Sequence, residues 1–172
     1  MSEIHISILG EKEIPKLDLI KYYLQANNIN EIKPKAGRLA FLINSTKVKV
    51  YEYSEIQDIK SKDIINNQCV IIIFDMTKRK SFMDVLDKWI KFLREVKYNK
   101  KIILFGTGNK DALTMTDEQE CTYLIEITGI QGEFYDLRNM EKPLICKLID
   151  KLIEKVFEYA KNNVNKKDCN IF

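Results

Sequence analysis

The sequence has few of the residues that build metal and redox centres. It contains one histidine, His5, and four cysteines, at positions 69, 121, 146 and 169. No cysteine has the C-x-x-C or Cys/His spacing of a metal site, and His5 falls within a predicted strand. We therefore predict no cysteine and histidine metal centre, and we expect the protein to reside in the reducing cytosol.

The sequence also lacks an excess of charge and a long apolar run. Its net charge of +3 is small and no aromatic side chains cluster with basic ones, which argues against a nucleic-acid partner. No apolar run approaches the roughly 18 residues that span a bilayer, and Met-Ser-Glu does not begin a secretory signal. With 172 residues, 45% hydrophobic and 31% charged, the chain is expected to form one globular domain.

Strand and helix patterns alternate along the chain. The clearest strand signal is the apolar run Cys69–Phe74, and the clearest helix signal is the apolar stripe of residues 81–96. Further strands are predicted at 4–9, 38–44, 47–53, 102–105 and 133–137. Further helices are predicted at 16–27, from about 116 and from about 143, with a weak helical pattern at 55–67.

This alternation predicts a three-layer, doubly wound α/β fold with a mostly parallel six-stranded sheet. Only the second and third strands, joined by Ser45 and Thr46, are close enough in sequence for an antiparallel hairpin. We assign residues 1–160 to this domain and residues 161–172 to a flexible basic tail. A ligand of such a sheet is expected past the carboxyl ends of the strands.

The segment after the first predicted strand has the layout of a phosphate-binding loop. The general pattern is G-x-x-x-x-G-K-[ST], and here it reads Gly10-Glu-Lys-Glu-Ile-Pro15-Lys16-Leu17. Gly10 and Lys16 fit the pattern. Pro15 has no N–H to offer a phosphate, and Leu17 has no hydroxyl for Mg²⁺.

Acidic side chains in the same loop also disfavour a polyphosphate. Glu11 and Glu13 would repel it by several kcal/mol in order of magnitude at a partly buried site. We interpret Lys16 as a surface lysine at a helix terminus, with a phosphate contact as the alternative.

The best-defined motif is Val70–Phe82, which reads Val-Ile-Ile-Ile-Phe-Asp-Met-Thr-Lys-Arg-Lys-Ser-Phe. With Trp89 in the following helix and the strand Lys47–Glu52, it resembles the small GTPases of the Ras superfamily, most closely the Rab branch. The resemblance spans nearly the whole chain. It implies the small G-protein fold and, where the site is functional, GTP or GDP with Mg²⁺.

Other motifs of this family are altered here. The Asp-x-x-Gly-Gln of switch II aligns with Glu52-Tyr-Ser-Glu55-Ile56. The resemblance allows the Glu52 carboxylate to face Mg²⁺. Ile56 occupies the position of the family's catalytic Gln, and its alkyl side chain can neither donate nor accept a hydrogen bond. We therefore assign no catalytic residue. Residues 29–37 contain no Thr for switch I.

The guanine-binding Asn-Lys-x-Asp motif is matched only with a shift. Asn109 and Lys110 fit, whereas Asp111 comes one residue early. An alignment without the shift places Thr107–Lys110 there and matches nothing, and both alignments remain open. The candidate nucleotide-binding residues are Gly10, Lys16, Leu17, Asn109, Lys110 and Asp111.

The residues Cys169-Asn-Ile-Phe172 resemble a C-a-a-X prenylation motif, with Phe172 favouring a geranylgeranyl group. One lipid chain binds membranes only marginally. Lys161, Lys166 and Lys167 would therefore strengthen binding to an anionic leaflet. We predict lipidation of Cys169 and a place on the cytosolic face of a membrane.

These patterns favour a GTPase-like protein with weak or no GTP binding, for which we expect no cofactor. It would bind effector or regulator proteins through the switch-side surface, formed by the second and third strands and residues 53–67, and act in vesicle trafficking or signalling. Two alternatives remain. One is a slow but genuine GTPase switch that binds through Lys16, Asn109, Lys110 and Asp111, with Glu52 toward Mg²⁺, and the other is a structural subunit of a larger assembly.

Overall fold

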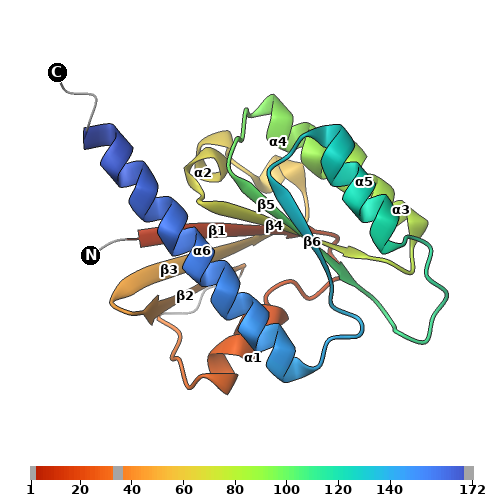
Figure 1. Cartoon of the computed structure of the whole chain (residues 1–172), viewed down its shortest axis with the longest axis horizontal. Coiled ribbons are helices and arrows are strands. Elements are labelled where there is room, and N and C mark those ends of the chain that lie inside the picture. The colour runs from red at the N-terminus through yellow and green to blue at the C-terminus, as the bar shows by residue number, and fades with distance from the viewer. Residues whose placement is uncertain (1–2, 33–36, 169–172) are drawn as a thin grey trace.

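The computed structural model describes the backbone of residues 3–32 and 37–168, and the side chains up to residue 160 (Figure 1). Six strands form one sheet in the order β2-β3-β1-β4-β5-β6. β2 and β3 are antiparallel, and all other neighbours are parallel, as predicted. The strands are β1 (Glu3–Gly10), β2 (Arg38–Ile43), β3 (Thr46–Tyr53), β4 (Cys69–Asp75), β5 (Lys101–Thr107) and β6 (Gly132–Asp136).

Helices cover both faces of the sheet (Figure 1). One face carries α1 (Asp18–Ala26) and α6 (Lys142–Asp168), whose apolar side chains form a core with β1, β3 and β4. Tyr23 of α1 donates a hydrogen bond of 2.6 Å to Asp150 of α6. The other face carries α2 (Ser61–Asn66), α3 (Arg79–Asp84), α4 (Lys91–Glu95) and α5 (Glu118–Thr128). The doubly wound prediction is therefore confirmed.

Local sequence explains two of the connections. The β2–β3 hairpin turns at Asn44 and Ser45, whose φ angles of 48° and 64° give the left-handed backbone that a two-residue hairpin needs. Asp117 caps α5 in a capping box, where its carboxylate accepts a 2.8 Å hydrogen bond from the N–H of Glu120. The predicted helix near residue 116 is thus present and begins at Glu118.

Two predicted boundaries differ from the structure. The single helix expected at 81–96 is interrupted by a π-helical segment, η2 (Val85–Ile90), between α3 and α4. This segment buries Trp89 and leaves Lys88 beside the segment that follows β3. The last helix continues to Asp168, past the start of the tail predicted at Lys161, and Cys169 lies outside the described residues.

Within the described part of the chain, no helix has the length and apolar character that crossing a membrane requires.

Candidate nucleotide site

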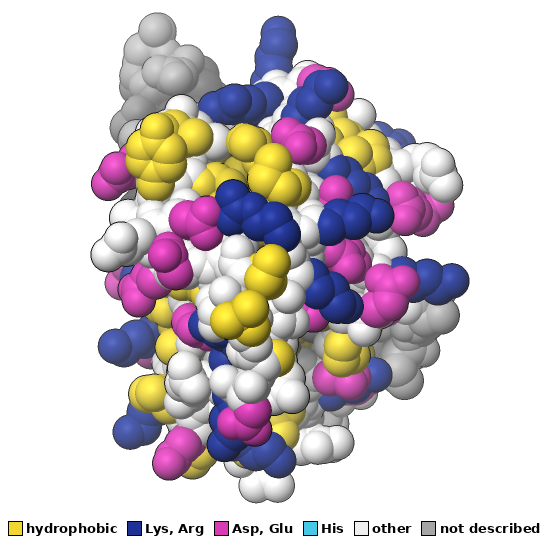
Figure 2. Space-filling model, turned by 90° about the vertical axis from the view of Figure 1, so that its right-hand side faces the viewer, with side chains coloured by type: hydrophobic (Ala, Val, Ile, Leu, Met, Phe, Trp, Pro, Cys, Tyr) yellow, Lys and Arg dark blue, Asp and Glu magenta, His cyan; other side chains and the backbone are white. Residues whose placement is uncertain are grey.

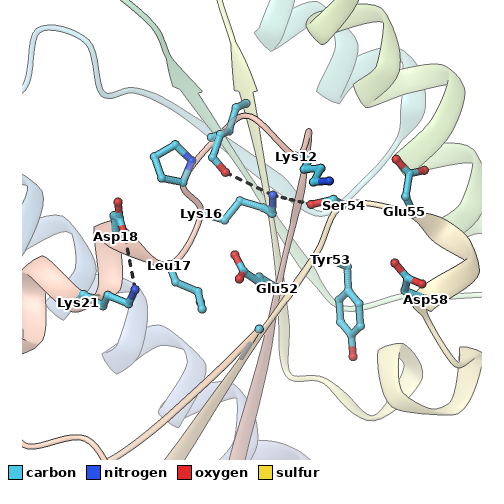
Figure 3. Close-up of a pocket in the computed structure, with 13 residues that line it drawn as sticks. Lys12, Lys16, Leu17, Asp18, Lys21, Glu52, Tyr53, Ser54, Glu55 and Asp58 are labelled. Carbon is cyan, nitrogen blue, oxygen red and sulfur yellow. Dashed lines mark hydrogen bonds and ion pairs between the residues drawn. The ribbon is translucent and has the colours of Figure 1, made fainter. Parts of the chain in front are cut away.

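A pocket of about 590 Å³ lies at the carboxyl ends of β1 and β3 (Figure 3). The predicted phosphate loop forms one wall through Lys12 and residues 14–17. The segment after β3, residues 54–58, forms the opposite wall together with the end of β3, and we call it the switch segment. It contains η1 (Ile56–Asp58). The pocket is where parallel α/β sheets bind their ligands.

Gly10 has a packing role in this structure. A Cβ at this position would lie 2.5 Å from the carbonyl oxygen of Ile73 on the neighbouring strand β4. Glycine is required there because the two backbones approach so closely. The presence of Gly10 is therefore explained without a phosphate.

Backbone N–H groups in and next to the phosphate loop donate to carbonyl groups of the loop itself. The N–H of Ile14 donates to the carbonyl of Glu11 at 3.2 Å, and the N–H of Asp18 donates to the carbonyl of Pro15, also at 3.2 Å. Pro15 itself has no N–H. A phosphate loop binds its anion with backbone N–H groups. Ile14, Pro15 and Asp18 have no N–H group free for an anion.

Lys16 is buried, with only 2% of its surface exposed, so the prediction that it is a surface lysine is wrong. Its ammonium nitrogen donates to the carbonyls of Glu11 and Ile14, at 2.7 and 3.3 Å. It also donates to Ser54 Oγ at 2.9 Å (Figure 3). An ammonium group has three N–H donors, and these contacts use all of them. Burial lowers the pKa of Lys16, and the carboxylate of Glu52 acts in the opposite direction.

The residues present do not fit the family's Mg²⁺ ion. Leu17 is 6% exposed and belongs to the main core cluster, where a Ser or Thr hydroxyl would be needed. The carboxylate of Asp18 pairs with Lys21 at 3.6 Å. Glu52 lines the pocket, but no group of three or more His, Cys, Asp or Glu suited to a metal occurs among the described residues.

The charge of the pocket also disfavours a nucleotide. The lining carries three lysines and four carboxylates, a formal charge of −1, whereas a triphosphate requires a surplus of positive charge. These residues are Lys12, Lys16, Lys21, Asp18, Glu52, Glu55 and Asp58.

Two lysines from different parts of the chain hold the switch segment by hydrogen bonds. Lys16 bonds the Ser54 hydroxyl, and Lys88 of η2 donates to the Ser54 carbonyl and to the Glu55 carboxylate, both at 3.0 Å. Ile56, at the position of the family's catalytic Gln, packs against the second core cluster. Sequence reasoning missed Ser54 and Lys88, because the contacts arise only from the loop conformation and from the π-helical segment.

The predicted guanine-binding residues lie apart from this pocket. Asn109, Lys110 and Asp111 are exposed, and the Asn109 side-chain oxygen accepts a 3.0 Å hydrogen bond from the N–H of Asp111. None of the three lines the pocket beside the phosphate loop. They also do not line a second pocket of about 300 Å³, to which Asp75 and Thr107 contribute.

Two residues of the second pocket, Asp75 and Lys78, form an ion pair at 3.4 Å. Burial acts to raise the pKa of Asp75, but hydrogen bonds from the N–H and hydroxyl of Thr77, together with Lys78, lower it. Gly108 has a φ of 126°, and a Cβ there would lie 2.6 Å from Asp75 Oδ1. Arg138 pairs with Asp136 at 2.7 Å.

The chain matches the sequence model of the Ras family over residues 7–157. The matched region runs from within β1 to within α6 and includes the phosphate loop, the switch segment and both pockets.

Proposed function

Because the chain belongs to the Ras family and is a small GTPase-like protein, we propose that it acts as a partner-binding domain with weak or absent guanine nucleotide binding. It would be a Rab-like member, held on the cytosolic face of a membrane through a lipid on Cys169. Its role would be in vesicle trafficking or signalling.

The observation that carries the proposal is the complete engagement of Lys16. Its three donors are taken by Glu11, Ile14 and Ser54, so a phosphate could bind it only by displacing one of them. Displacing Ser54 would also strain the two contacts from Lys88. The buried Leu17 and the excess of carboxylates in the pocket act in the same direction.

The proposed partner surface is the switch-side surface, formed by β2, β3 and residues 53–67. In the described structure, hydrogen bonds from Lys16 and Lys88 hold the switch segment. A surface fixed in this way would present one conformation to effector or regulator proteins, so that binding would not depend on GTP. Preorganisation of this kind lowers the entropic cost of association.

Titration with a fluorescent GDP analogue in the presence of Mg²⁺ tests the proposal. We expect no saturable binding up to about 100 µM, which corresponds to less than roughly 5–6 kcal/mol of binding free energy. The Lys16→Met variant should behave like the wild type. Submicromolar binding that Lys16→Met abolishes would overturn the proposal.

A slow but genuine GTPase is the second candidate, because the pocket beside Lys16 has the position and the volume to admit phosphates. This candidate predicts that GTP protects the switch segment from amide exchange. The proposed lipid on Cys169 is tested separately. Cys169→Ser should release the protein from membranes in a cell that prenylates proteins.

A further inference from the structure

The outer face of α5 exposes large apolar side chains. α5 buries Cys121, Leu124 and Thr128 against the sheet, as an amphipathic helix should. On its opposite side, Tyr123 and Ile127 lie one turn apart and are 62% and 55% exposed. Two such side chains on neighbouring turns of a solvent-facing helix form an exposed apolar strip.

The same part of the chain is acidic. Residues 111–137 contain seven Asp and Glu and no Lys or Arg, although the whole chain has 28 Lys and Arg. Some of these carboxylates are paired, such as Glu120 with Arg79 at 2.5 Å. Glu118 and Glu126 make no ion pair with any residue whose side chain is described, and both are exposed.

Tyr123 lies between these two carboxylates along the helix. Glu118, Tyr123 and Glu126 line a shallow hollow of about 360 Å³. The two glutamates are eight positions apart in the sequence, which places them about 12 Å apart along the axis at the helical rise of about 1.5 Å per residue. We call this surface the α5 face; it consists of Glu118, Gln119, Thr122, Tyr123, Glu126 and Ile127.

Figure 2 views the side of the molecule on which α3 and α5 lie in Figure 1. Hydrophobic and acidic side chains lie beside one another on this side, with Lys and Arg side chains between them. The basic side chains do not come from residues 111–137.

We propose that the α5 face binds a basic amphipathic helix of another protein. That helix would carry two Lys or Arg side chains about two turns apart, to pair with Glu118 and Glu126. An apolar side chain between them would pack on Tyr123 and Ile127. Charge complementarity selects this occupant, because nucleic acids and anionic membranes would be repelled by the two free carboxylates. The inference does not depend on whether the protein binds nucleotide.

A labelled helical peptide with two lysines two turns apart and leucines midway serves as the probe. The comparison peptide has glutamate in place of both lysines. We expect the lysine peptide to bind with a dissociation constant of about 10 µM in fluorescence anisotropy at low salt, and the glutamate peptide at least about tenfold more weakly.

Variants of the protein locate the binding site. The double variant Glu118→Lys, Glu126→Lys should bind the lysine peptide about tenfold more weakly and the glutamate peptide more tightly than the wild type does. Tyr123→Ala should bind both peptides more weakly. The matched controls Glu95→Lys and Leu42→Ala change exposed residues elsewhere and should have no effect. Unchanged thermal melting would show that each variant is folded.

Three results would overturn the proposal. The first is the absence of saturable binding by the lysine peptide. The second is equal binding of both peptides, or binding that the double variant leaves unchanged. The third is a dimer in sedimentation experiments that Tyr123→Ala dissociates, because the α5 face would then bind a second copy of this chain.

Discussion

Replacing Leu17 with serine restores the hydroxyl that the phosphate-loop pattern requires and removes an apolar side chain that is 6% exposed. Buried Leu→Ala changes cost about 2–5 kcal/mol, and a serine hydroxyl among the apolar neighbours of Leu17 adds to that cost. We expect Leu17→Ser to lower the free energy of unfolding by about 3–5 kcal/mol. The melting temperature should fall by roughly 10 °C for a domain of this size.

Urea unfolding followed by tryptophan fluorescence measures this effect. Trp89 is the one tryptophan of the sequence and is 2% exposed, so its emission reports unfolding of the core. Leu17→Met keeps the volume and should cost less than about 1.5 kcal/mol. Leu113→Ser, at a position 81% exposed, should stay within about 0.5 kcal/mol of the wild type.

Two results would refute the assignment of Leu17 to the core. One is a loss below about 1 kcal/mol in Leu17→Ser, which would mean that the side chain is not packed as described. The other is stabilisation of Leu17→Ser by Mg²⁺ and GTP at millimolar concentration, which would mean that the restored hydroxyl completes a working site.

Three further predictions concern other parts of the molecule. Thr116 is buried and its hydroxyl has no partner in the described structure, so Thr116→Val should stabilise by about 1 kcal/mol in the same unfolding assay; destabilisation would contradict this. Burial acts to raise the pKa of Glu133, but hydrogen bonds, first among them that from Lys101, lower it to about 2. The stability advantage over Glu133→Gln should therefore be complete above about pH 5 and shrink as the pH falls toward 2; an advantage that grows in acid would refute it. Lys88→Met should speed amide exchange in the switch segment, whereas the exposed control Lys91→Met should not; equal exchange would remove the role given to Lys88.

The strands, the antiparallel hairpin and the two-sided core could be predicted because they depend on local apolar patterns. The run Cys69–Phe74 is buried along its whole length, and β2 and β3 form the predicted hairpin. The family resemblance rested on the same segments, and the match over residues 7–157 supports it.

The state of Lys16 could not be predicted in the same way. Its burial depends on carbonyl groups of its own loop and on Ser54, which is 38 residues away in the sequence. Likewise, the reason for Gly10 is the approach of β4, which no local pattern reveals. Helical periodicity also gave no sign of η2, since a π-helical segment changes the apolar spacing only slightly.

The amount of guanine nucleotide carried by the freshly purified protein tests most directly whether this Ras-family domain works without one. Denaturing the protein and quantifying the released nucleotide by chromatography gives moles of GDP and GTP per mole of chain. We predict a value close to zero, with the protein folded and unchanged by added EDTA. A value close to one mole of GDP or GTP per chain would contradict the account of Lys16, Leu17 and the switch segment given above.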